Sequence, residues 1–176
     1  MPTAGNGPGR KAECRPVNFP SIFLWGFVAT VFLTTLMAAG QGLGWSRMSL
    51  PFMLGTLFTA DRHLAMVIGF IFHFVNGWLF ALFYALVFED LHLTGWWLGA
   101  GIGVMQGLTV LIALMPILPA VHPRMASESR GPEPTHALEP PGFMALNYGR
   151  QTPLLTLAAH AVYGAILGGF YRLAGG

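Results

Sequence analysis

Two histidines are the residues of this 176-residue sequence whose type and spacing could most directly support chemistry. His73 and His160 each lie inside a long apolar segment. Gly69 and Gly77 stand four residues on either side of His73, and Gly164 follows four residues after His160. Neutral imidazole binds iron axially, so two histidines on facing helices would form the ligand set of a b-type haem. One histidine on a glycine-lined face would also suit the magnesium of a chlorophyll.

Both histidines also have a simpler interpretation, in which they form hydrogen bonds between helices. Such a bond is worth about a kcal/mol or less in membranes. Ionisable groups inside membrane segments often serve a function, so two alternatives stay open. One is the binding of haem b or (bacterio)chlorophyll by His73 and His160, and the other is a transport or proton path. The residue pattern favours the structural hydrogen bond, and no cofactor is expected.

A few further polar residues lie near or inside the apolar segments. Glu89, Asp90 and His92 fall together between two of these segments, and carboxylates with an imidazole can hold a divalent metal ion. Because charged residues are common where a turn meets water, no metal site is predicted there. Gln106 is a lone polar side chain beside Gly107, which predicts an interhelical hydrogen bond.

The distribution of charge identifies the elements that position these side chains. Asp, Glu, Lys and Arg make up only 9% of the residues, and none occurs in segments 19–42, 63–88, 93–120 or 153–171. At about 1.5 Å per residue, each segment can cross or nearly cross a hydrocarbon core of about 30 Å as a helix. The sequence therefore predicts an all-α integral membrane protein, a bundle of four transmembrane helices.

The remaining segments complete the predicted organisation. Residues 1–18 form a polar N-terminal tail, and residues 19–120 hold the first three transmembrane helices. The apolar stretch near 49–59 is too short to span the membrane and predicts one short helix, either interfacial or re-entrant. Residues 121–152 form a Pro-rich polar loop, and residues 153–176 hold the fourth transmembrane helix and the C-terminus.

Local signals predict how the middle helices begin, end and pair. Asp61 precedes segment 63–88 and is a good N-cap. Only a few residues separate segments 63–88 and 93–120, which predicts an antiparallel hairpin. Pro116 and Pro119 are expected to kink or end the third helix.

Small residues form a pattern in three of the four segments. Glycines let helix backbones approach closely in lipid, where van der Waals packing drives association. The pattern predicts packing within the bundle, with self-association or docking on a larger complex as the alternative. The predicted packing residues are Gly69, Gly77, Gly99, Gly103, Gly107, Gly164 and Gly168.

The composition excludes several functions. Lys11 is the only lysine and precedes the first apolar segment, so a Schiff base inside the membrane is excluded. Cys14 is the only cysteine, which excludes an internal disulfide and a four-thiolate iron–sulfur cluster. A net charge of +2 gives no basic surface for nucleic acid. Because P-loop, GxSxG and HExxH motifs do not occur either, no enzymatic activity is predicted.

The C-terminal part of the chain carries a recognisable pattern. Gly142 and Phe143 begin an apolar patch, and the last segment reads H-x-x-Y-G-x-x-x-G at His160, Tyr163, Gly164 and Gly168. This pattern resembles the closing segment of a family of small, uncharacterised four-helix bacterial inner-membrane proteins. The stretch HFVNGWLFALFYAL in segment 63–88 is similar to the second helix of that family. The resemblance implies a four-helix bacterial inner-membrane protein and carries over no activity.

Together these features predict a non-catalytic accessory or scaffold subunit of a bacterial membrane complex, with an energy-transducing or pigment-containing complex as one candidate host. The expected partners are the lipid bilayer and either other membrane subunits or further copies of the chain. The alternatives are a haem- or chlorophyll-binding protein and a small oligomeric transporter or channel. Arg10, Lys11 and Arg15 precede the first helix, which favours cytoplasmic N- and C-termini.

Overall fold

The computed structural model describes residues 17–127 and 138–174 of the chain. Within these ranges the fold is helical and has no strand apart from one isolated pairing of Met125 with Leu138. Of the predicted tail at 1–18, all but the last two residues lie outside the described residues. The elements are α1 (Phe19–Gly42), α2 (Leu50–Gly55), α3 (Arg62–Leu91), α4 (Trp96–Thr109), η1 (Val110–Leu114), α5 (Met115–Val121), η2 (Phe143–Tyr148) and α6 (Thr152–Phe170).

Four helical stretches are long and apolar enough to cross a membrane. They are Phe19–Gly42, Arg62–Leu91, Trp96–Val121 and Thr152–Phe170. The third stretch runs through α4, η1 and α5 without a break. The predicted all-α class and its four long apolar helices are confirmed.

α3 has a clear signal at each end. The Asp61 carboxylate accepts a hydrogen bond from the backbone N–H of Leu64 at 2.7 Å, so Asp61 is the N-cap, as predicted. At the other end the helix continues past Glu89 to Leu91, because acidic side chains do not interrupt its backbone hydrogen bonds. It ends where His92 adopts a left-handed backbone conformation, with φ of 53°.

The prolines of the third long helix do not end it. Pro116 and Pro119 both lie within α5. Just before them the chain forms the π-helical turn η1, in which the N–H of Met115 donates to the carbonyl of Val110, five residues earlier. A wider turn accommodates the bulky ring of a proline and its missing N–H.

α2 lies within the stretch 49–59, where the sequence predicts a short interfacial or re-entrant helix. It has only six residues, and its Pro51 and Gly55 are buried. The carbonyl of Pro51 lies where a Cβ at Gly69 would stand, and the backbone of α3 likewise lies where a Cβ at Gly55 would stand. Because neither position carries a side chain, the two helices touch backbone to backbone. α2 is therefore packed closely against α3.

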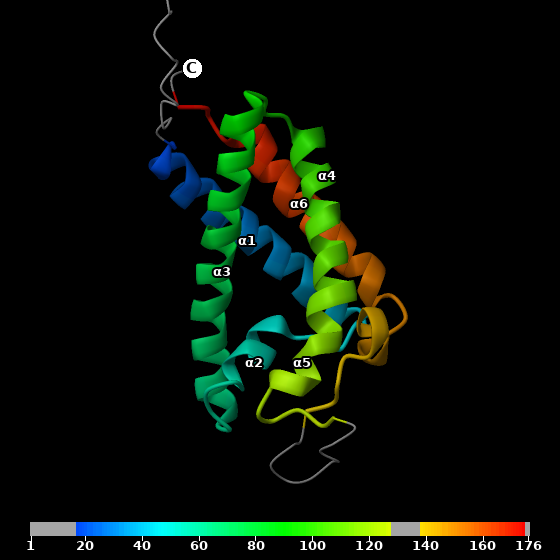
Figure 1. The fold of residues 1–176 in the computed structure, drawn as a ribbon. Coiled ribbons are helices and arrows are strands. Elements are labelled where there is room, and N and C mark those ends of the chain that lie inside the picture. Colours follow the sequence, from blue (N-terminus) through cyan, green and yellow to red (C-terminus); the bar gives the residue numbers. More distant parts are fainter. Residues whose placement is uncertain (1–16, 128–137, 175–176) are drawn as a thin grey trace, which may run out of the picture.

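The long helices pack in particular pairs (Figure 1). α4 packs against α6, and α1 packs against both α6 and α3. α3 and α4 follow one another through the short turn at residues 92–95, as the predicted hairpin requires, but they make almost no direct packing contact. In Figure 1 they run along opposite sides of the bundle, with α1 and α6 crossing the view obliquely.

The contact between α4 and α6 is made at glycines. A Cβ added at Gly99 would meet the carbonyl of Gly164, and one added at Gly103 would meet the carbonyl of His160. In the same way, a Cβ at Gly168 would meet the carbonyl of Gly95. The two backbones are therefore in direct contact over several turns.

The remaining predicted packing glycines also face other parts of the same chain. Gly107 faces the His160 side chain of α6, and Gly77 faces Thr30 of α1. Gly69 is covered by α2, as described above. At all seven predicted packing glycines, a Cβ would therefore meet atoms of the same chain.

Hydrogen bonds join the start of α1 and the residues that follow α6 to α3 at one end of the bundle. The Tyr171 hydroxyl donates to the carboxylate of Glu89 at 2.8 Å and accepts from the N–H of Asn18 at 3.2 Å. The N–H of Ala174 donates to the same carboxylate at 2.7 Å. Burial raises the pKa of Tyr171 to about 12, and its hydrogen bond to Glu89 adds to the rise. The start of α1 and the ends of α3 and α6 thus lie at one end of the bundle.

His122 joins the end of α5 to α2 at the opposite end. It is fully buried; its Nε2 lies 3.1 Å from the Met53 carbonyl, and its Nδ1 accepts from the N–H of Arg124 at 3.1 Å. The Arg124 guanidinium donates to the Thr56 carbonyl at 2.6 Å. Burial lowers the pKa of His122; the hydrogen bond to Met53 partly offsets this, and the charge of Arg124 adds to it. The neutral ring, with its proton on Nε2, fits both hydrogen bonds.

We expect the glycine contact to be the most sensitive part of the fold. Gly103→Leu and Gly164→Leu should each separate α4 from α6. Each should lower the free energy of unfolding by about 1–3 kcal/mol or more. Gly101→Leu is the matched control on α4, because a Cβ there meets nothing within 4 Å. Thermal unfolding in detergent measures the difference. Equal melting temperatures for the three variants would contradict the described contact.

His122 should make stability depend on pH. The pKa of His122 in the folded chain lies below the ordinary value of 6.5. At a pH between the folded and the ordinary pKa, the unfolded chain therefore binds a proton that the folded chain does not. Stability should therefore fall as the pH is lowered from about 7.5 to about 5.5. His122→Gln should be less stable at about pH 7.5 but lose less on acidification, whereas the exposed His63→Gln should behave like the unaltered protein. An unchanged pH dependence in His122→Gln would refute this role.

Candidate functional site

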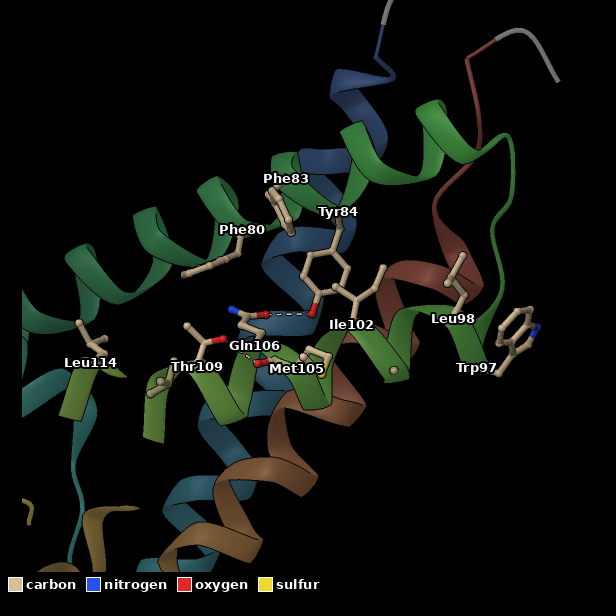
Figure 2. A pocket seen from close by; sticks show the side chains of 12 residues that line it. Phe80, Phe83, Tyr84, Trp97, Leu98, Ile102, Met105, Gln106, Thr109 and Leu114 are labelled. Carbon is tan, nitrogen blue, oxygen red and sulfur yellow. Dashed lines mark hydrogen bonds between the residues drawn. The ribbon is translucent and has the colours of Figure 1, made fainter. Parts of the chain in front are cut away.

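The space between α3 and α4 is a groove of about 830 Å³, here called the α3/α4 groove (Figure 2). Pockets that bind small molecules have volumes of about 300–1,000 Å³, so the groove is large enough for a ligand. On the α3 side it is lined by Phe80, Phe83 and Tyr84. On the α4 side it is lined by Trp97, Leu98, Gly101, Ile102, Met105, Gln106 and Thr109, and at η1 by Val110 and Leu114.

The groove is apolar and open to the outside of the bundle. None of its described lining residues is charged. More than half of the surface of Phe83, Trp97 and Met105 is exposed. At Gly101 a Cβ would meet nothing within 4 Å. A long apolar molecule can therefore enter the groove from the side.

One hydrogen bond crosses the groove. The Tyr84 hydroxyl of α3 donates to the side-chain oxygen of Gln106 of α4 at 2.8 Å. Figure 2 shows the amide nitrogen of Gln106 turned away from Tyr84. The interhelical hydrogen bond predicted for Gln106 is therefore present. Because this bond uses the amide oxygen, the two N–H donors of the amide are left to bind another group.

A smaller cavity of about 100 Å³, here called the inner cavity, lies beside the groove. The two share Phe80, Gln106, Val110 and Leu114. The other polar residues that line the inner cavity are Thr30, His73, Asn76, His160 and Tyr163. The structure thus brings the two predicted histidines to the same cavity, on the facing helices α3 and α6.

Two linked hydrogen bonds determine which ring nitrogen of His73 carries the proton. The Thr34 hydroxyl donates to the Thr30 carbonyl at 2.7 Å, and a hydroxyl has one proton to give. The Thr34 oxygen lies 2.9 Å from Nε2 of His73 and must therefore accept from it. His73 is 6% exposed, and Thr34 of α1 is a partner that the sequence pattern did not identify.

His160 is held by its own helix. Its Nδ1 lies 2.8 Å from the carbonyl of Thr156, one turn earlier, and therefore donates to it. The Thr156 hydroxyl oxygen is buried and, within the described chain, has no hydrogen-bond partner. One turn beyond His160, the Tyr163 hydroxyl donates to the carbonyl of Gly77 on α3 at 2.6 Å. This bond joins α3 to α6 directly beside the two histidines.

These distances bear on the predicted alternative of a tetrapyrrole between His73 and His160. A haem with two axial histidines needs a gap between the helices wide enough for the macrocycle. The inner cavity measures only about 100 Å³, and the bond from Tyr163 to Gly77 closes the gap. His160 lines the inner cavity but not the α3/α4 groove. The two histidines in this arrangement do not fit a haem or chlorophyll between them.

Glu89, in the last turn of α3, has a structural role. Glu89 is 6% exposed, and its carboxylate accepts from Tyr171 and Ala174. In the described ranges no three His, Cys, Asp or Glu side chains come together in a way that could hold a metal ion. The carboxylate therefore anchors the C-terminal end of the bundle.

The chain matches no protein-family model, no curated protein and no solved structure. The candidate site is accordingly defined by its geometry alone.

We expect His73 and His160 to be hydrogen-bonding residues. His73→Gln keeps a donor for Thr34 and should lower stability by no more than about 0.6–1.7 kcal/mol. Thr34→Val removes the acceptor and should cost at least as much. Both variants and His160→Gln should assemble normally, and the purified unaltered protein should show no Soret-region absorption band. A stoichiometric Soret band that is lost in either histidine variant would instead make the pair a tetrapyrrole site.

Proposed function

We propose that the protein is a non-catalytic integral membrane accessory subunit of a bacterial cytoplasmic-membrane complex, and that it holds a long apolar molecule of the bilayer in the α3/α4 groove. The single observation that carries this proposal is the separation of α3 from α4. Two helices joined by a short turn would ordinarily bury their apolar faces against each other. Here those faces instead line a groove of about 830 Å³ that is open at the side.

The lining of the groove favours a flexible chain over a partner helix as its occupant. Close packing of transmembrane helices depends on small residues at the contact. In the groove only Gly101 is small and open, whereas bulky side chains such as Phe83, Trp97 and Met105 project from both walls. A flexible apolar chain can pass between such side chains, but a helix backbone cannot come close to them.

The hydrogen bonds inside the bundle support a non-catalytic role. Tyr84 is paired with Gln106, Tyr163 with the backbone of α3, and His73 with Thr34. These bonds tie the two tyrosine hydroxyls and the His73 ring to other groups of the chain, whereas catalysis needs acid, base or nucleophile groups aimed at a substrate. The resemblance of the C-terminal pattern to small bacterial inner-membrane proteins supports the proposed location.

Filling the groove should exclude its occupant. Gly101→Phe places a ring in the open space of the groove, and Gly42→Phe is the matched control, since a Cβ at Gly42 also meets nothing within 4 Å and lies outside the groove. The full-length protein is placed in nanodiscs with a phospholipid that carries a photoactivatable group in mid-chain. Labelling of the groove peptides should fall several-fold in Gly101→Phe and stay unchanged in Gly42→Phe. Labelling spread evenly over all exposed apolar helices of the unaltered protein would argue against the groove.

The proposed topology places both termini in the cytoplasm. Reporter fusions after Arg15, within 89–92 and at Arg172 should therefore report the cytoplasmic side, and fusions within 121–141 the opposite side. The hydrogen bonds that join Asn18, Glu89 and Tyr171 support the grouping of the first three. A fusion after Arg15 that reports the side opposite to one at Arg172 would exclude four crossings.

A further inference from the structure

We infer, on the basis of the proposed binding groove, that its ligand is an isoprenoid quinone whose ring carbonyl accepts a hydrogen bond from the side-chain amide of Gln106. The inference concerns the chemical class of the ligand. It depends on the depth of Gln106, on the absence of charge in the groove lining and on the aromatic wall of α3.

The depth of Gln106 excludes the headgroup of an ordinary phospholipid. Gln106 lies ten residues beyond Trp96, the first residue of α4. At about 1.5 Å per residue this is about 15 Å along the helix, which is half of a hydrocarbon core of about 30 Å. Headgroups of phospholipids stay at the membrane surface. A ligand that reaches Gln106 with a polar group must carry that group into the middle of the membrane.

The chemistry of the groove excludes a charged ligand. No charged side chain belongs to the described lining of the groove or of the inner cavity. A fatty-acid carboxylate in this place would be left without a counter-ion, which is costly in an apolar environment. The polar group of the ligand is therefore uncharged.

The amide of Gln106 excludes a pure hydrocarbon. The bond from Tyr84 fixes the amide oxygen, and Figure 2 shows the nitrogen turned away from Tyr84. Its two N–H groups need acceptors, because an unsatisfied donor inside an apolar region destabilises the complex. A hydrocarbon offers no acceptor, whereas the carbonyl of a quinone does.

The shape of the groove suits a flat ring with a long tail. Phe80, Phe83 and Tyr84 line the groove on α3, opposite Gln106 and Met105 on α4 (Figure 2). A planar ring can stack or pack edge-on against such aromatic side chains. The apolar remainder of the groove, toward Trp97, accommodates part of an isoprenoid tail. An isoprenoid quinone combines an uncharged acceptor, a planar ring and an apolar tail.

Binding to the unaltered full-length protein in nanodiscs gives the first test. Decylubiquinone, a benzoquinone with an alkyl tail, is titrated while tryptophan fluorescence is followed, and squalene, an isoprenoid without a carbonyl, is tested as a competitor. We expect decylubiquinone to bind saturably and to be displaced by squalene only when squalene is in about tenfold excess, because one hydrogen bond separates them. Squalene that competes at equal concentration would overturn the inference and leave the proposed groove in place.

Variants give the second test. Gln106→Leu should weaken decylubiquinone binding about tenfold and should not weaken squalene binding. Tyr84→Phe, which frees the amide to rotate, should weaken quinone binding less. Gly101→Phe should weaken both ligands, which reports on the groove itself. If Gln106→Leu does not assemble, Tyr84→Phe and the competition with squalene still test whether the Gln106 amide binds the quinone. Equal quinone affinity in all variants, or recovery of phospholipid and no quinone from the protein purified from native bacterial membranes, would refute the inference.

Discussion

The carbonyls of Gly164 and His160 lie directly against Gly99 and Gly103, so α4 and α6 touch backbone to backbone. Most of the remaining architecture depends on this contact. α4 packs against α6, and α1 packs against both α6 and α3. α3 therefore makes almost no direct packing contact with α4 apart from the hydrogen bond between Tyr84 and Gln106. α3 and α4 therefore do not pack their apolar faces together, although only a short turn connects them. The groove between them is a direct consequence of where the glycines are.

Polar groups inside the bundle obey a second constraint, since an apolar environment leaves no water to satisfy them. The hydroxyl of Thr34 donates a hydrogen bond to a backbone carbonyl and accepts one from His73, and the Tyr163 hydroxyl donates to a carbonyl of the neighbouring helix. Two groups differ: the Thr156 hydroxyl has no hydrogen-bond partner within the described residues, and the bond from Tyr84 to Gln106 engages only the oxygen of the amide. The lining of the groove therefore includes amide N–H donors that the bond to Tyr84 does not use, and the proposed ligand binds there.

The sequence predicts the long helices of this fold well and their pairing poorly. Four helices are identified by the absence of charged residues from segments 19–42, 63–88, 93–120 and 153–171. Inside an apolar medium a single segment can satisfy its backbone hydrogen bonds only as a helix. Spacing of four also identifies the glycines as contact residues. The partner of each glycine, however, depends on which helices meet. The short α2 and the separation of α3 from α4 follow from tertiary packing, so a local pattern could not reveal the groove. Sequence reasoning placed His73 and His160 near each other but missed that Tyr163 closes the gap between their helices.

The glycine contact also sets an order of events during synthesis. Gly99 and Gly164 are separated by 65 residues. At about 5–20 residues per second, α4 emerges roughly three to thirteen seconds before the part of α6 that covers it. In that interval the glycine face of α4 has no partner within the chain, while α1, α2 and α3 are already complete. The final architecture therefore requires the nascent α4 to wait beside α3 without packing against it, and the bulky side chains that line the groove on α3 and α4 are well suited to keep the two helices apart.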